Sequence, residues 1–135
     1  MLQTIQTANA TLQIKSMEEV PFGEVPGELK LSKGSFVLAY AGDLQGEGIL
    51  EELKVHFNAK NAVMQGLQRF TGKLDDKSGS FVLQHEGRFV NGVVSSKMTV
   101  VPTSGTDGLK GLRGRMKLQS VSAESFAVTF TYHFA

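Results

Sequence analysis

A few polar side chains stand among apolar residues on alternating segments, and these are the residues that could do chemistry. In Ser80–Val90, His85 shares a face with Phe81 and Leu83, while the opposite face is polar. The apolar face of such a strand faces the interior, so we expect His85 to point inward. The same rule predicts four further inward polar residues: Tyr40, Glu51, Gln68 and Tyr132.

Convergent polar groups within an apolar cavity are typical of a small-molecule site. Two alternatives remain for these residues. They could form a polar network that only seals the interior, or they could lie in water at the mouth of the cavity.

Other chemistries lack their signatures. The chain has no Cys, which excludes a disulfide scaffold, a cysteine nucleophile and thiolate metal sites. His56, His85 and His133 are far apart in sequence, so we expect no metal site. The glycines of Gly105–Gly111 lack the Gly-Lys-Ser/Thr of a phosphate loop, and the Gly-x-Ser-x-Gly of a nucleophile elbow is missing. We therefore expect no cofactor.

The charge pattern excludes some partners. The formal net charge is +1, too weak for a nucleic-acid or anionic-membrane surface. Residues 1–52 carry a net charge of −5 and residues 53–135 a net charge of +6. We favour strands of opposite charge becoming neighbours over the alternative, a basic patch that binds an anion, which would contain Lys110, Arg113, Arg115 and Lys117. The first ten residues have neither a signal-peptide pattern nor a long apolar run, so we expect a cytoplasmic protein.

The elements that must position these residues are short strands. Alternation with period two predicts about eight of them: Thr11–Ser16, Leu31–Ala41, Glu47–Phe57, Ala62–Lys73, Ser80–Val90, Val93–Val101, Leu112–Ser120 and Phe126–Phe134. Asn58–Asn61 and Asn91-Gly92 read as hairpin turns, Val20–Gly27 as a Pro/Gly loop, and Thr103–Gly111 as a loop with room for one helical turn.

This pattern predicts an all-β fold with little helix and a single domain over residues 1–135. A two-sheet sandwich and a closed antiparallel barrel both fit about eight strands joined by hairpins. We favour the closed, lipocalin-like barrel because nearly every strand keeps one strongly apolar face, as a small barrel requires of all its strands. Closure also removes exposed sheet edges.

Several motifs resemble those of a bacterial domain-of-unknown-function family, DUF3224, from about residue 10 to the C-terminus. They are Gly42–Gly48, Gly66–Gly72, Ser78–Gly87, Val100–Thr106 and Gly111–Gly114. The resemblance implies an eight-stranded antiparallel barrel similar to allene oxide cyclase, with an internal cavity and no established activity. Glu51, Arg69, His85 and Arg113 match the family pattern. Gln68 departs from it, since members usually have Glu there, which puts a shared catalytic mechanism in doubt.

Three functions fit these observations. The first is a barrel that binds a small apolar or amphipathic ligand, with the candidate binding residues Tyr40, Glu51, Gln68, His85 and Arg113. The second is a cyclase or isomerase that uses Glu51 as a base or an electrostatic stabiliser, a reading that rests on fold analogy. The third is a homo-oligomeric scaffold, since the apolar Val37, Ala39 and Ala41 lie on the face opposite Phe36.

Overall fold

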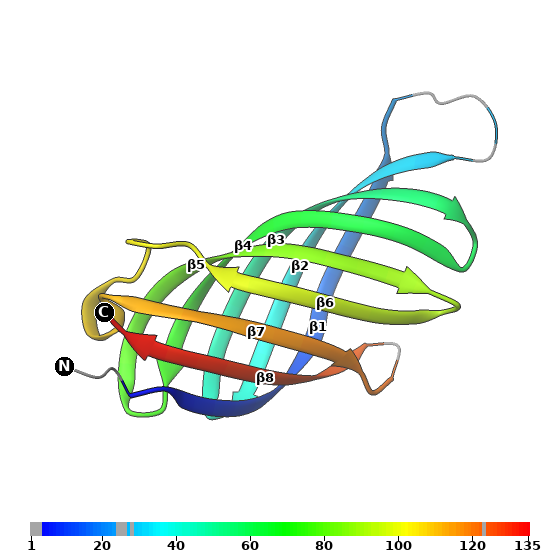
Figure 1. Cartoon of the computed structure of the whole chain (residues 1–135). Coiled ribbons are helices and arrows are strands. Elements are labelled where there is room, and N and C mark those ends of the chain that lie inside the picture. Colours follow the sequence, from blue (N-terminus) through cyan, green and yellow to red (C-terminus); the bar gives the residue numbers. More distant parts are fainter. Residues whose placement is uncertain (1–3, 24–26, 28, 123) are drawn as a thin grey trace.

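Eight strands form a closed antiparallel barrel in chain order (Figure 1). The structure is a computed structural model that describes residues 4–23, 27, 29–122 and 124–135. The strands are β1 (Gln6–Pro21), β2 (Lys30–Gly42), β3 (Leu44–Asn58), β4 (Asn61–Leu74), β5 (Lys77–Val90), β6 (Val93–Val100), β7 (Leu112–Ser120) and β8 (Ser125–Phe134). One short 3-10 helix, η1 (Asp107–Leu109), precedes β7. The predicted all-β barrel is confirmed.

Pairing between the first and last strands closes the sheet. In β1 and β8, Gln6 pairs with Tyr132 and Gln13 pairs with Ser125. The alternation of apolar and polar residues favours this closure. Every second residue of β8 is buried, namely Phe126, Val128, Phe130 and Tyr132. The apolar face of a strand is best shielded from water when the neighbouring strands on both sides continue the same buried layer, and a closed barrel provides this for every strand.

The turns follow their local sequence. Asn91 and Gly92 have φ values of 51° and 82°, the left-handed pair that a two-residue hairpin requires. The side chain of Asn58 accepts the Lys60 backbone N–H at 2.9 Å and so stabilises the turn between β3 and β4. Both predicted hairpins are confirmed, and η1 supplies the one helical turn expected in Thr103–Gly111.

The prediction for β1 was too short. The strand runs from Gln6 to Pro21, with a register shift between Ile14 and Ser16. The extra residue at this bulge interrupts the alternation of apolar and polar residues, so the pattern does not predict the second half of the strand. The predicted loop Val20–Gly27 therefore begins in a strand, and residues 24–26 of it lie outside the described residues.

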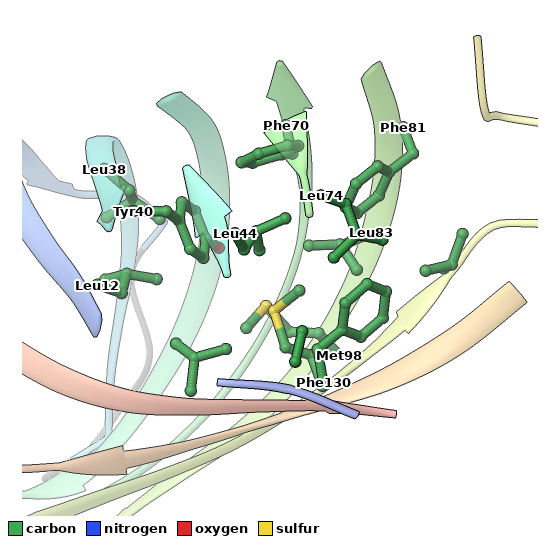
Figure 2. Packing of buried hydrophobic residues seen from close by; sticks show 14 of the residues in the cluster. Leu12, Leu38, Tyr40, Leu44, Phe70, Leu74, Phe81, Leu83, Met98 and Phe130 are labelled. Atoms are coloured by element: carbon green, nitrogen blue, oxygen red, sulfur yellow. The ribbon is translucent and has the colours of Figure 1, made fainter. Parts of the chain in front are cut away.

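One end of the barrel is solidly packed. This packed end carries the β2–β3 and β4–β5 turns and η1, whose Leu109 is fully buried. The Phe70 ring lies 5.0 Å from Phe81, and the Phe81 ring lies 6.0 Å from Phe130, measured between centroids. Figure 2 shows these rings with other buried side chains of the interior. We call the opposite end, where the β3–β4 and β5–β6 turns lie, the open end (Figure 1).

Within the described residues, no helix is long and apolar enough to cross a membrane.

Candidate functional site

A cavity of about 320 Å³ occupies the barrel interior at the open end. Its volume lies at the lower end of the range for small-molecule sites. The wall is mainly apolar, with Leu12, Phe36, Leu50, Phe89, Leu118 and Phe126 among the lining residues. Polar lining side chains are few: Glu52, Lys54, His56, His85 and Ser96.

A wider groove of about 690 Å³ lies across β4–β8 and is lined by charged residues that include Arg88, Lys97 and Lys117. These side chains are exposed or half-buried, so water already solvates them. The interior cavity is therefore the candidate site, because a few polar groups are set there among apolar walls.

A chain of three hydrogen-bonded side chains links the cavity floor to the core. The Tyr40 hydroxyl donates to Gln68 Oε1 at 2.6 Å, and Gln68 Nε2 donates to His85 Nε2 at 2.7 Å. All three are buried, with Gln68 completely inaccessible and His85 lining the cavity. The predicted inward orientation of Tyr40, Gln68 and His85 is confirmed.

The Gln68 amide fixes the proton on His85. An amide nitrogen has no lone pair to offer, so His85 Nε2 must accept and the ring proton lies on Nδ1. Burial lowers the pKa of His85 to about 4, which keeps the imidazole neutral. Burial likewise raises the pKa of the Tyr40 phenol, with the Gln68 hydrogen bond opposing it. The floor of the cavity is therefore polar but uncharged at neutral pH.

A glycine in β3 makes this chain possible. Tyr40 lies on β2 and Gln68 on β4, so their hydrogen bond must cross β3. A Cβ atom at Gly48 would lie 2.1 Å from Gln68 Oε1 and 3.2 Å from the Tyr40 ring. Any side chain at position 48 would therefore displace the amide or the phenol.

The predicted orientation of β3 is wrong. Glu51 lies on the outer face, exposed, and accepts the Ser35 hydroxyl at 2.6 Å, whereas Glu52 is only 6% exposed and lines the cavity. The apolar residues that share the face of Glu51 misled the prediction, because Leu53 and Phe57 are 46% and 44% exposed.

Register explains the inversion of β3. Leu50 pairs directly with Phe36 on β2 and with Gln68 on β4, both of which face inward. Even-numbered residues of β3 must therefore face inward too. The glycines at 46 and 48 on that face weakened its apolar signal, and Leu50 was the residue that could have revealed it.

Three polar residues of β3, together with Glu19 of β1 and Ser32 of β2, form what we call the mouth cluster: Glu19, Ser32, Glu52, Lys54 and His56. Lys54 Nζ lies 2.9 Å from Glu19 Oε1 and 3.8 Å from Glu52 Oε1. The Ser32 hydroxyl donates to Glu19 Oε1 at 3.1 Å and lies 2.8 Å from His56 Nε2. The prediction that Glu51 faces inward places the alternate residues Glu52, Lys54 and His56 on the outer face, so the sequence did not reveal this cluster.

The two carboxylates of the mouth cluster differ. Burial raises the pKa of Glu52, Lys54 opposes this, and Glu19 adds to it by like-charge repulsion. For Glu19 burial also acts upward, but hydrogen bonds and charge from Lys54 outweigh it and lower the pKa. Glu19 therefore holds the stronger ion pair, and Glu52 is the less stabilised anion.

Two other predicted residues lie away from the cavity. Tyr132 faces inward as expected, but at the packed end, where its hydroxyl donates to Asp75 and, at 3.2 Å, to Gln6. Arg113 lies half-buried on the outer side of β7, and its guanidinium donates to the Leu112 carbonyl oxygen at 3.4 Å. Among the described residues, no three His, Asp or Glu side chains are grouped as metal ligands.

Comparison with known proteins supports the fold. Residues 8–132 match the protein family described as Protein of unknown function (DUF3224). The chain is also similar to a crystal structure of a protein with unknown function from the DUF3224 family of Shewanella oneidensis MR-1. The two share 25% sequence identity over 99% of each chain, with a TM-score of 0.76. A search of curated proteins finds no significant match.

Proposed function

The chain belongs to the DUF3224 family of proteins of unknown function, and from that premise we propose that it binds a small apolar or amphipathic ligand in its barrel cavity. The observation that supports this proposal is the hollow open end. The cavity of about 320 Å³ is lined mainly by apolar side chains, and its few polar lining residues include His85 on the floor and Glu52, Lys54 and His56 at the mouth. A ligand there would bury its apolar body and keep polar contacts at either end.

The division of the interior supports binding over a purely structural barrel. The packed end holds the large rings of Phe70, Phe81 and Phe130, each at most 1% exposed. Barrel closure and stability can come from that end, which leaves the cavity free for a ligand. Glu51 lies outside the cavity, so it does not support the cyclase or isomerase hypothesis that used it as a base.

Octanol tests the proposal, because the cavity holds about ten non-hydrogen atoms at the density of liquid water. Isothermal titration calorimetry should show one octanol bound per chain. Ala62 is buried in the cavity wall, and Ala62→Phe should weaken octanol binding about tenfold or more. The added ring displaces ligand contacts worth roughly two methylene groups.

Ala41 provides a matched control, since it is exposed on the outer side of β2. Ala41→Phe adds the same ring outside the barrel and should leave octanol binding unchanged. If octanol fails to bind the native protein, or binds both variants equally well, the cavity is not a binding site.

A further inference from the structure

The Glu52 carboxylate faces the cavity with little coordination of its own. The residue is 94% buried and lines the cavity wall. Among the described residues, the cation that pairs with Glu52 is the Lys54 ammonium, which lies 3.8 Å away, beyond hydrogen-bonding distance. That ammonium is already held by Glu19 at 2.9 Å and lies over the Phe36 ring, 5.4 Å from its centroid. A buried carboxylate in this position is stabilised by any donor that enters the cavity.

The charge of the mouth cluster selects the kind of donor. Two carboxylates, Glu19 and Glu52, face one ammonium, Lys54, so the cluster carries one net negative charge when His56 is neutral. On the cavity floor, His85 is neutral. Glu52 and Lys54 both line the cavity, and Lys54 is already paired with the exposed Glu19. A cationic ligand would therefore supply the partner that Glu52 lacks, whereas an anionic ligand would add a negative charge next to Glu52.

The aromatic residues of the cavity wall also favour a positively charged ligand. Phe36, Phe89 and Phe126 line the cavity, and the faces of such rings attract cations. The Lys54 ammonium over Phe36 shows this contact already formed within the protein. Carboxylate and ring faces together are a combination that recognises an ammonium group on an apolar body.

We propose that the ligand is a cationic amphiphile, a primary amine or ammonium compound of about ten non-hydrogen atoms, whose nitrogen binds the Glu52 carboxylate. The apolar body lies against Phe36, Leu50 and Phe126 and reaches toward His85 on the floor. This inference rests on the proposed function, because it names the ligand class for the same cavity.

Three probes of equal chain length test the inference by calorimetry at neutral pH: octylamine, octanol and octanoate. We expect octylamine to bind about tenfold more tightly than octanol, because it adds a charge-assisted hydrogen bond. Octanoate should bind most weakly. This ranking is measured on the native protein and does not depend on the folding of any variant.

Neighbouring residues on β3 supply a matched pair of variants. Glu52→Gln should lower the affinity for octylamine about tenfold and so remove the preference for it over octanol. The affinity for octanol should stay unchanged. Glu51→Gln removes a carboxylate from the outer face and should change neither affinity.

Each outcome separates the two proposals. If octanol binds but octylamine has no advantage, or octanoate binds best, the cationic ligand class is overturned and the binding cavity stands. A preference for octylamine that persists in Glu52→Gln also overturns the assignment to Glu52. If none of the three probes binds, the proposed function fails and this inference fails with it.

Discussion

Gln68 is the residue that joins the phenol, the imidazole and the core into one uncharged unit. Its amide oxygen accepts a hydrogen bond from the Tyr40 hydroxyl, and its amide nitrogen donates one to the His85 ring. The same nitrogen lies 3.5 Å from the Met98 sulfur. A glutamate there would place a buried charge between the two aromatic partners, at a cost that the amide avoids. The inward facing of these residues was predictable, because their strands alternate cleanly. Their hydrogen bonds were not, since register between strands decides which side chains meet.

Replacement of Gln68 should be costly. Gln68→Leu leaves the Tyr40 hydroxyl and the His85 ring without their partner inside the barrel. We expect the free energy of unfolding to fall by about 2–4 kcal/mol, measured by urea titration. Gln65→Leu, on the exposed face of the same strand, should change it by less than about 0.5 kcal/mol. Equal effects at the two positions would show that the buried hydrogen bonds contribute little.

His85 should make stability depend on pH. Burial lowers the pKa of His85 from 6.5 to about 4. Between these two pH values the unfolded chain binds a proton at His85, whereas the folded protein keeps the ring neutral. Stability is therefore lost as pH falls from 6.5 to about 4, by about 3 kcal/mol in total.

The variant His85→Gln keeps an acceptor for the Gln68 amide but cannot titrate. As pH falls from 6.5 to about 4, the native protein loses this contribution and the variant does not. The difference in unfolding free energy between them should therefore become smaller over that range. A difference that stays constant with pH would mean that burial in the barrel does not lower the pKa of His85.

At the scale of elements, β3 is where prediction from sequence failed and where register decided the outcome. Leu53, Val55 and Phe57 share an apolar face with Glu51, which predicts that this face points inward, yet the pairing of Leu50 with Phe36 and Gln68 places it outside. Strands such as β5 and β8 were predicted correctly, because apolar and polar residues there separate onto opposite faces. The consequence for the site was large, since Glu52 replaced Glu51 as the carboxylate in the cavity.

Gly48 links β3 to the polar chain on the cavity floor. Gly48→Ala would place a Cβ 2.1 Å from Gln68 Oε1, and we expect a loss of about 2 kcal/mol in unfolding free energy. In a double-mutant cycle, the same change in a Gln68→Ala background should cost at least about 1 kcal/mol less. Additive effects would show that Gly48 acts through something other than the amide of Gln68.

At the scale of the whole molecule, the barrel separates stability from binding by its two ends. Phe126 and Phe130 lie on the same strand and the same face, but Phe126 lines the cavity and Phe130 stacks on Phe81 and Tyr132. The closed barrel was predictable from eight apolar strand faces. The position of the hollow was not, because it depends on how side chains of different sizes fill each layer.

The two phenylalanines allow one substitution to be compared in two settings. Phe130→Leu should lower the free energy of unfolding by about 1–3 kcal/mol, because the packed end cannot close around the lost ring. Phe126→Leu should cost less, since it enlarges a space that already exists, and it should change ligand affinity more. Thermal or urea unfolding measures the first effect and calorimetry the second, and a reversed order would contradict the division of the barrel.

The homo-oligomer predicted from Val37, Ala39 and Ala41 stays a prediction. The outer face of β3 and β4 also exposes Ile49, Leu53 and Leu67, at 45%, 46% and 56%. We expect light scattering to give a mass above 14.6 kDa at high concentration. A monomer under those conditions would contradict subunit contact on this face.

The most direct test of the binding cavity is a crystal structure of the protein grown with octylamine. We expect density for the alkyl chain inside the open end, with its nitrogen within hydrogen-bonding distance of the Glu52 carboxylate and its tail directed toward His85. A cavity that holds only water at saturating octylamine, or an amine bound solely on the outer surface, would contradict the account.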